Sequence, residues 1–198
     1  MTVSSTLSWK SALRAFWLGL LLACCAGAVR AAGEVEVKSA ALVPGEDGYV
    51  LNADFRVELS PHLEEVVSRG VPLYFLLEFE LTRDRWYWFD ESVAARSQTY
   101  RLSYHALTRQ YRLSTGALAQ SFQTLDEALR ILSRVREWQV ADKGALKPGM
   151  TYEAAVRLHL DLGELPKPLQ VTAIGRKEWN IGSEWHRWPY TAPEREAK

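Results

Sequence analysis

Cysteine is almost absent from this chain. Its 198 residues include two cysteines, Cys24 and Cys25, and both lie in an apolar run near the start. If that run is removed, the remaining chain has no disulfide, no thiol nucleophile and no cysteine that could bind a metal. Its stability must then come from a hydrophobic core, and residues 32–198 are numerous enough to form one.

The first 31 residues match the pattern of a secretory signal peptide. Lys10 and Arg14 give a positive start, and the run AFWLGLLLACCAGAV follows at residues 15–29. The triplet VRA at residues 29–31 fits the small-x-small cleavage rule. We therefore expect cleavage before Ala32 and a mature protein that is soluble in the periplasm.

Two alternatives for this segment stay open. The stretch LLAC at residues 21–24 resembles a lipobox, which would leave the protein lipid-anchored through Cys24, although Leu22 is larger than the residue usual at its position. The segment could also stay uncleaved as a membrane anchor, but its apolar run is shorter than the ~20 residues that cross a bilayer as a helix. We expect no membrane span in the mature chain, because no second apolar stretch reaches that length.

An excess of charge of one sign is also missing. Lys and Arg together number 24, and so do Asp and Glu. The first 31 residues contain three bases and no acid, so the mature chain carries 21 bases against 24 acids, a net charge of −3. This balance argues against nucleic acid as a partner.

Motifs for metal binding and for nucleophilic catalysis are missing as well. The four histidines, His62, His105, His159 and His186, are not spaced as H-x-H or H-x-x-x-H, and a zinc site needs three or four converging ligands. The sequence has no G-x-S-x-G nucleophile motif. We therefore predict no metal site, no cofactor and no catalytic residue.

Alternation at the period of a β-strand is abundant in the mature chain. The stretch PGEDG at residues 44–48 is typical of a turn between two strands, at residues 34–43 and 49–59. The other predicted strands are residues 71–82, residues 86–89, residues 99–105 and 110–114 (a hairpin that follows a polar loop), residues 138–140 and residues 151–162.

Two short helices are predicted between these strands. Ser60 and Pro61 begin the first, and Gly70 ends it. A capping box at residues 124–127 begins the second. Its apolar stripe consists of Leu125, Ala128, Leu129, Leu132 and Val135. The stretch LPKPLQ at residues 165–170 is expected to be extended.

These elements predict a mainly β domain at residues 32–190, followed by a disordered tail at residues 191–198. The expected architecture is an antiparallel β-sandwich with two short helices, of which an immunoglobulin-like arrangement is one form. The alternative is an α+β fold in which the capped helix packs on an antiparallel sheet.

The segment RDRWYWFDE at residues 83–91 contains four consecutive aromatic residues, Trp86, Tyr87, Trp88 and Phe89. In a strand, their rings would point to both faces of the sheet. Residues 73–77 are also apolar on both faces, so we expect this part of the sheet to be covered on both sides, once by the capped helix. The aromatic residues are then a structural cluster, and the alternative is a surface platform for a ligand.

Two acids are candidates for catalysis. Glu78 and Glu80 share one strand face about 7 Å apart, a separation that glycoside hydrolases can use. The interpretation that the pattern favours is a solvated strand face, neutralised by Arg83 or Arg85.

Basic and aromatic residues alternate around the predicted hairpin. Arg101, Arg109 and Arg112, with Tyr104 and His105, form the candidate binding surface. Arginine binds phosphate and carboxylate groups, so the expected partner is an anionic envelope component or an envelope protein. The interpretation that the sequence favours, however, is a cross-strand ladder in which these arginines pair with Glu78 and Glu80 of the neighbouring strand.

Five stretches of the sequence resemble a known family. They are RDRWYWFDE, YRLSYHALTRQYRLSTG, LKPGMTY, LPKPLQ and WNIGSEW, and together they span nearly the whole mature chain. The sequence resembles a bacterial envelope family known as a domain of unknown function, DUF4390. The resemblance implies a location in the cell envelope and a genetic link to a membrane sensor kinase of the nitrogen-regulation type, and it transfers no chemistry.

Two functions are therefore expected. The first is a non-catalytic periplasmic binding or accessory module that contacts an envelope component or the sensor kinase. The second is a cell-wall-active hydrolase that uses the surface carboxylates of Glu78, Glu80 or Asp90. A deep cleft that holds a carboxylate pair would favour the second.

Overall fold

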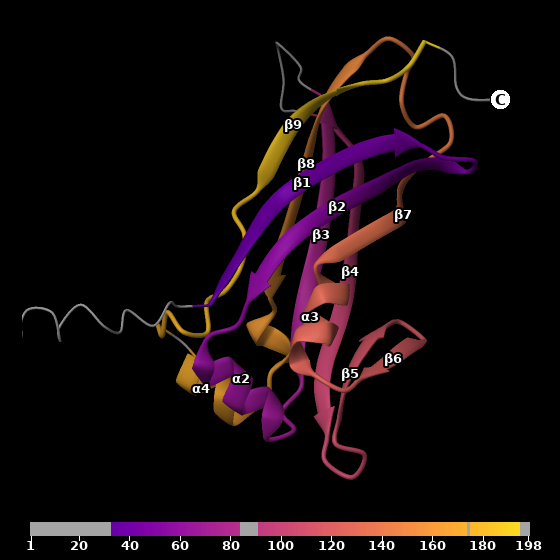
Figure 1. Ribbon diagram of the computed structural model, residues 1–198. Coiled ribbons are helices and arrows are strands. Elements are labelled where there is room, and N and C mark those ends of the chain that lie inside the picture. Colours follow the sequence, from indigo (N-terminus) through magenta and orange to yellow (C-terminus); the bar gives the residue numbers. More distant parts are fainter. Residues whose placement is uncertain (1–32, 84–90, 174, 195–198) are drawn as a thin grey trace, which may run out of the picture. The chain divides into compact units, whose positions relative to one another are not determined.

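Two antiparallel sheets make up most of the chain that the structure describes. The computed structural model describes residues 33–83, 91–173 and 175–194 (Figure 1). One sheet has three strands in the order β1-β2-β7, and the other has six strands in the order β6-β5-β4-β3-β8-β9. The protein therefore has the mainly β fold that the alternation predicted. The expected signal peptide lies outside the described residues.

The three-stranded sheet is built on the predicted hairpin of β1 (Glu34–Pro44) and β2 (Gly48–Glu58). The odd-numbered residues of β2 from Leu51 to Val57 are buried, as the alternation predicted. β7 (Arg134–Asp142) pairs with the other edge of β2. A Cβ atom on Gly48 would lie 2.2 Å from the carbonyl oxygen of Ala141, so glycine is required where these two strands approach each other.

The six-stranded sheet is built around β3 (Leu73–Arg83), which pairs with β4 (Glu91–His105) and β8 (Thr151–Leu160). The odd-numbered residues of β3 are fully buried from Leu73 to Leu81. The sheet is completed by β5 (Gln110–Thr115) and β6 (Leu118–Phe122) on one side and by β9 (His186–Thr191) on the other.

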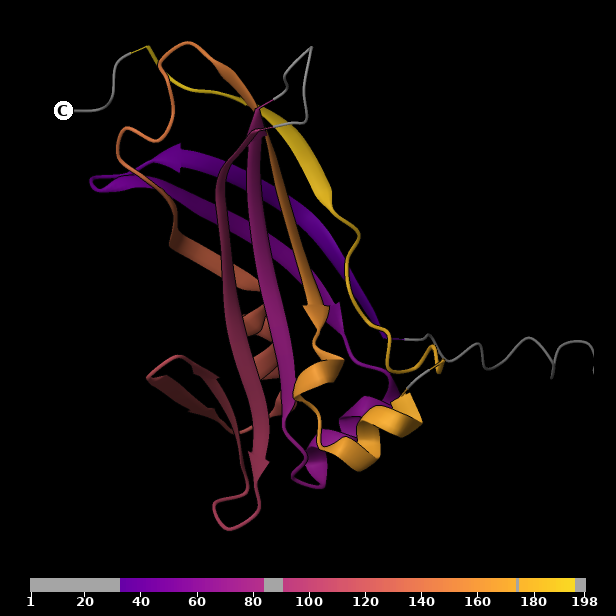
Figure 2. The ribbon, with the colours of Figure 1, turned by 180° about the vertical axis from the view of Figure 1, so that it is seen from behind.

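The inner faces of the two sheets enclose one hydrophobic core. It includes Phe55 from β2, Phe75 and Phe79 from β3 and Val156 from β8. Figures 1 and 2 show β1 and β2 as a layer that crosses β3, β4 and β8. The arrangement is an antiparallel β-sandwich, and the described strands form no closed barrel.

Both predicted helices are present with the predicted caps. The Ser60 hydroxyl accepts a hydrogen bond from the Leu63 amide at 3.3 Å at the start of α2 (Pro61–Ser68). The Thr124 hydroxyl accepts one from the Glu127 amide at 3.2 Å at the start of α3 (Leu125–Leu132). α3 packs against β2, β5, β6 and β7. The predicted contact of this helix with Trp86, Tyr87, Trp88 and Phe89 concerns residues outside the described part of the chain.

Three details of the predicted secondary structure were wrong. The stretch before Thr99 is not a loop, because the backbone of β3 pairs with β4 from Glu91 onward. Val135 is not on the helix stripe, because α3 ends at Leu132 and Val135 lies in β7. Residues 73–77 were expected to be covered on both faces of the sheet. The inner face of β3 is covered, but Leu76 on its outer face is only half-buried.

The stretch LPKPLQ is not extended, which was the fourth error. Its last four residues begin a third helix, α4 (Lys167–Ala173), and the short 3₁₀ helix η1 (Leu162–Glu164) precedes it. The Pro166 carbonyl accepts hydrogen bonds from the amides of Leu169 and Gln170 at 2.8 and 3.2 Å. Pro168 stands in the first turn, where a helix needs no amide donor, so proline does not prevent helix formation here.

The end of the domain extends slightly further than expected. β9 includes Thr191, and Ala192 is buried with its amide hydrogen-bonded to the Met150 carbonyl at 2.9 Å. Ordered structure therefore continues past residue 190, and residues 195–198 lie outside the described part. None of the described helices is long and apolar enough to cross a membrane.

Candidate functional site

Most arginines in the described chain are paired with carboxylates. Thirteen arginines lie in the described ranges, and eight of them have a carboxylate oxygen within 4.0 Å. The eight are Arg56, Arg69, Arg83, Arg96, Arg136, Arg157, Arg176 and Arg187. These pairs are part of the cross-strand and local contacts of the fold.

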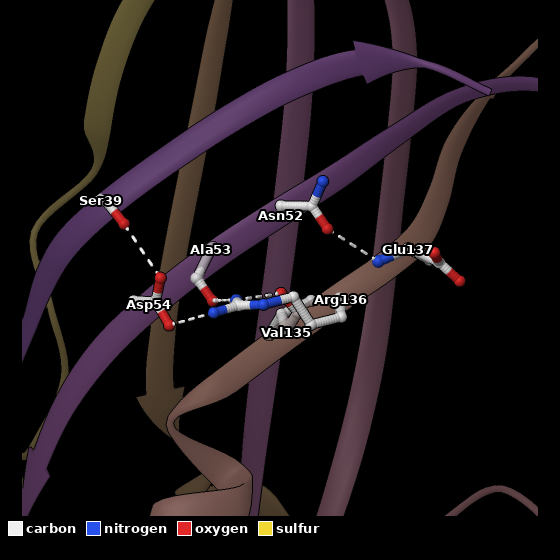
Figure 3. A network of polar contacts seen from close by, with 7 residues as sticks. All are labelled: Ser39, Asn52, Ala53, Asp54, Val135, Arg136 and Glu137. Atoms are coloured by element: carbon white, nitrogen blue, oxygen red, sulfur yellow. Dashed lines mark hydrogen bonds and ion pairs between the residues drawn. The ribbon is translucent and has the colours of Figure 1, made fainter.

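Arg136 shows how such a pair joins strands. Its guanidinium donates to an Asp54 carboxylate oxygen at 2.6 Å and to the Ala53 carbonyl at 3.0 Å (Figure 3). Asp54 also accepts a hydrogen bond from the Ser39 hydroxyl at 3.2 Å. The hydrogen bond from Arg136, as the main cause, holds the pKa of the Asp54 carboxyl below its usual value. One arginine thus links β7 to β2, and through Asp54 to β1.

Three of the arginines that have no carboxylate partner lie together on the β4–β5 hairpin. Within the described residues, Arg101, Arg109 and Arg112 have no carboxylate within 4.0 Å. The reason can be read in the sequence, because residues 92–125 contain no aspartate and no glutamate. The ladder with Glu78 and Glu80, which the sequence favoured for these arginines, is not formed, and that prediction was wrong.

The register of the hairpin determines which way two of these arginines point. Arg101 faces Ser114, and Arg112 faces Ser103, so both arginines lie on one face of the sheet. Leu102 and Leu113 point to the opposite face and are buried in the core. Arg101 and Arg112 therefore lie on the outer face, where the Arg101 guanidinium is 5.9 Å from the centroid of the Tyr74 ring.

The turn of the hairpin carries Arg109. Its φ angle of 53° lies in the left-handed region, which glycine adopts more easily than arginine. The Thr108 hydroxyl lies 3.3 Å from Nδ1 of His105 and ties the two ends of the turn together. His105 and Arg109 are both exposed. We use the name cationic hairpin for Arg101, His105, Arg109 and Arg112.

Tyr104 is separated from these four residues. It lies on the inner face, where its ring centroid is 5.0 Å from that of Tyr111. The Tyr111 hydroxyl is 3.1 Å from the Ser68 hydroxyl at the end of α2. The Tyr104–Tyr111 pair therefore connects the hairpin to α2. Tyr104 is not part of the exposed surface that carries the other residues of the predicted binding site.

The other two unpaired arginines are close to acids. Arg130 on α3 and Arg134 on β7 line an open groove of about 510 Å³ between α3 and β2. Asp54, Glu58 and Asp126 line the same groove, so its charge is mixed. The cationic hairpin is the one cluster of arginines among the described residues that no acid balances.

Glu78 and Glu80, the candidate catalytic acids, do not form a pair of free carboxylates. The Glu78 carboxylate accepts a hydrogen bond from Nε of Arg157 at 2.5 Å, and the Arg157 guanidinium lies 4.5 Å from the Trp185 ring centroid. Glu80 is exposed. Arg83, expected to neutralise these acids, pairs with Glu91 instead. Glu78 therefore belongs to a cross-strand ion pair.

His159 lies beside this ion pair and is half-buried rather than on the surface. Its Nδ1 atom is 3.5 Å from the Glu78 carboxylate, and a Cβ atom on Gly182 would lie 2.6 Å from the Cβ of His159. Burial, and then the charge of Arg157, lower the pKa of His159. The histidine is therefore neutral near neutral pH, and Arg157 alone balances Glu78. No group of three or more potential metal ligands was found among the residues that the structure describes.

The sequence signal for the cationic hairpin is the long segment without acids, which is stronger than the alternation of arginine and tyrosine. Comparison with curated proteins and with solved structures finds no match. A family model described as a domain of unknown function matches residues 32–189. The chain belongs to the DUF4390 family.

Proposed function

We propose that this protein is a non-catalytic binding module of the cell envelope that binds an anionic envelope component or partner protein through its cationic hairpin. The observation that carries the proposal is that Arg101, Arg109 and Arg112 have no acidic partner among the described residues, whereas most of the other described arginines are paired. An unpaired guanidinium on the surface contributes little to folding and is free to bind phosphate or carboxylate groups.

The strain at Arg109 supports the same proposal. A left-handed conformation costs a non-glycine residue on the order of 1 kcal/mol, and glycine would avoid that cost. An arginine at this position is readily explained if its side chain is used. The predicted signal peptide and the envelope location that the family resemblance implies support an extracytoplasmic site of action. The sensor kinase that the same resemblance implies is a candidate partner protein.

The non-catalytic part of the proposal rests on the acids. The Glu78 carboxylate is held by Arg157, and an acid engaged in this way is poorly placed to donate or accept a proton. Two open surface hollows of about 510 and 540 Å³ contain neither Glu78 nor Glu80. These features favour binding over hydrolysis.

Retention on immobilised heparin, a generic polyanion, tests the proposal. The chain has no net positive charge, so it is retained only if a local cationic surface binds the matrix. We expect the variant Arg101→Gln/Arg109→Gln/Arg112→Gln to elute at a clearly lower NaCl concentration than the parent, with an unchanged thermal midpoint.

The matched control is Arg56→Gln/Arg69→Gln/Arg187→Gln. It removes the same net charge from three exposed arginines that are paired with acids. We expect its elution to stay close to that of the parent. Equal shifts for the two triple variants would show that net charge alone governs retention, and the proposal would be wrong.

A further inference from the structure

The tip of the cationic hairpin carries an exposed apolar side chain. Leu107 is 92% exposed, two residues from Arg109 and two from His105. The residues between them, Ala106 and Thr108, are uncharged. A leucine this exposed contributes almost nothing to the core, and it lies close to Arg109, which has no carboxylate within 4.0 Å among the described residues.

The position of this tip in the domain is also informative. In both views the β4–β5 turn lies at the same end of the sandwich as α2 and α4 (Figures 1 and 2). The described chain starts there as well, because a Cβ atom on Gly33 would lie 2.6 Å from the amide nitrogen of Ser60, the N-cap of α2. Val171 on α4 adds a second apolar side chain, 72% exposed.

We propose that this end of the domain docks on a membrane surface that carries anionic lipid headgroups. Arg109 and Arg112 bind the headgroup phosphates, and Leu107 inserts at the boundary between headgroups and acyl chains. The inference deepens the proposed function and rests on it, because it identifies the anionic component as lipid.

The combination of residue types favours a lipid surface over a soluble anion. Phosphate binding explains the arginines and leaves Leu107 unexplained, whereas an apolar pocket in a partner would explain Leu107 and leave the arginines unpaired. A bilayer interface accommodates both, since anionic headgroups attract cations and the acyl boundary accepts an apolar side chain.

Co-sedimentation of the full chain with vesicles tests the inference. The probes are vesicles of phosphatidylethanolamine and phosphatidylglycerol in a 3:1 ratio, and neutral vesicles of phosphatidylcholine. Any apolar anchor in the chain binds anionic and neutral vesicles alike. The ratio of the affinity for anionic vesicles to the affinity for neutral vesicles therefore measures the contribution of the cationic hairpin. We expect Arg109→Gln/Arg112→Gln to lower the affinity for anionic vesicles about 25-fold, since each cation near such a surface contributes about five-fold.

Leucine variants test insertion separately. Leu107→Ser is expected to lower the affinity for anionic vesicles about ten-fold, because a buried apolar side chain is lost. Leu118→Ser is the matched control, because Leu118 is 78% exposed in the same acid-free segment but lies at the other end of β5. It should bind like the parent.

Three results would overturn the inference. They are unchanged binding by Leu107→Ser, equal loss with Leu118→Ser, and equal binding of the parent to anionic and neutral vesicles. Heparin retention that depends on the arginines, without a preference for anionic vesicles, would overturn this inference and leave the proposed function standing. If neither arginine-dependent retention on heparin nor a preference for anionic vesicles is found, the proposed function and this inference are both refuted.

Discussion

Arginine has different roles on two surfaces of this protein. On the three-stranded sheet, Arg136 joins β7 to Asp54 and the backbone of β2. On the six-stranded sheet, Arg101 and Arg112 lie opposite serines and have no acid within reach among the described residues. The same residue type thus links strands where acids are interleaved with it, and stays available to a ligand where acids are excluded.

The two surfaces also share a local feature. Each carries one non-glycine residue with positive φ, Glu137 at 51° and Arg109 at 53°. Glu137 stands at the irregularity of β7, where its amide donates to the Asn52 side chain at 3.0 Å (Figure 3). That hydrogen bond offsets part of the backbone cost. We find no comparable hydrogen bond to the backbone of Arg109 among the described residues, and the proposed binding by its side chain would account for an arginine at this position.

The largest expected effect comes from giving the cationic hairpin the acids it lacks. In Ser103→Glu/Ser114→Glu, each new carboxylate lies directly across the sheet from Arg112 or Arg101. We expect heparin binding to weaken about 25-fold or more, because two cations are neutralised at about five-fold each. Titration at fixed ionic strength measures this. Ser103→Gln/Ser114→Gln, which adds no charge, should bind like the parent, and a similar loss there would mean that bulk rather than charge matters.

The next largest effect is expected on the paired surface. Arg136→Met removes the guanidinium that holds Asp54 and two backbone carbonyls, and we expect the free energy of unfolding to fall by about 1–1.5 kcal/mol. Urea denaturation measures this. Arg112→Met, the matched change on the hairpin, should cost less than about 0.5 kcal/mol. Equal losses would contradict the division of roles.

A smaller effect of opposite sign is expected at the hairpin turn. Arg109→Gly should raise the free energy of unfolding by about 0.5–1 kcal/mol, because glycine adopts positive φ without strain. The same change should weaken heparin binding. Thermal melts and heparin titration together test for this trade of stability against binding. A variant that is destabilised, or that binds like the parent, would show that Arg109 is not held there for binding.

The smallest effect concerns pH. The pKa of Asp54 is lowered in the folded state, mainly by its hydrogen bond from Arg136. The stabilisation is therefore complete above the unfolded-state pKa of about 4 and is lost as the pH falls through the lower folded-state value. We expect the parent to lose slightly more stability than Asp54→Asn between pH 5 and pH 3. Parallel pH profiles in urea denaturation would contradict this.

Much of the fold could be predicted because its signals are local. Alternation placed the inner faces of β2, β3 and β8, and the capping box at Thr124 placed α3. The first half of β4 could not be predicted in this way, because Ser92–Gln98 is held by pairing with β3 rather than by a buried face of its own. Helix α4 was missed because two prolines suggested an extended chain, whereas one of them stands where a helix tolerates it.

The candidate site could be predicted in part. The identity of the arginines follows from the sequence, and so does their lack of acidic neighbours along the chain. Which face they occupy depends on the register of β4 with β5, and this register separated Arg101 and Arg112 from Tyr104. The partner of Glu78 is Arg157, 79 residues further along the chain, and no local pattern could have identified it.

The central position of β3 has a consequence for the rate of folding. Its neighbour β8 lies far along the chain, and β7, the neighbour of β2, is also distant in the sequence. Both sheets are therefore completed by contacts between distant segments. Pairings of this kind close large loops before they gain stability, and mainly β domains with such contacts fold in about milliseconds to seconds. During that interval the apolar stripe of β3 is without its cover. A chain that leaves the ribosome or a translocation pore from its N-terminus therefore exposes β3 until residues 151–160 have emerged, and this is the stage at which the protein is most vulnerable to aggregation.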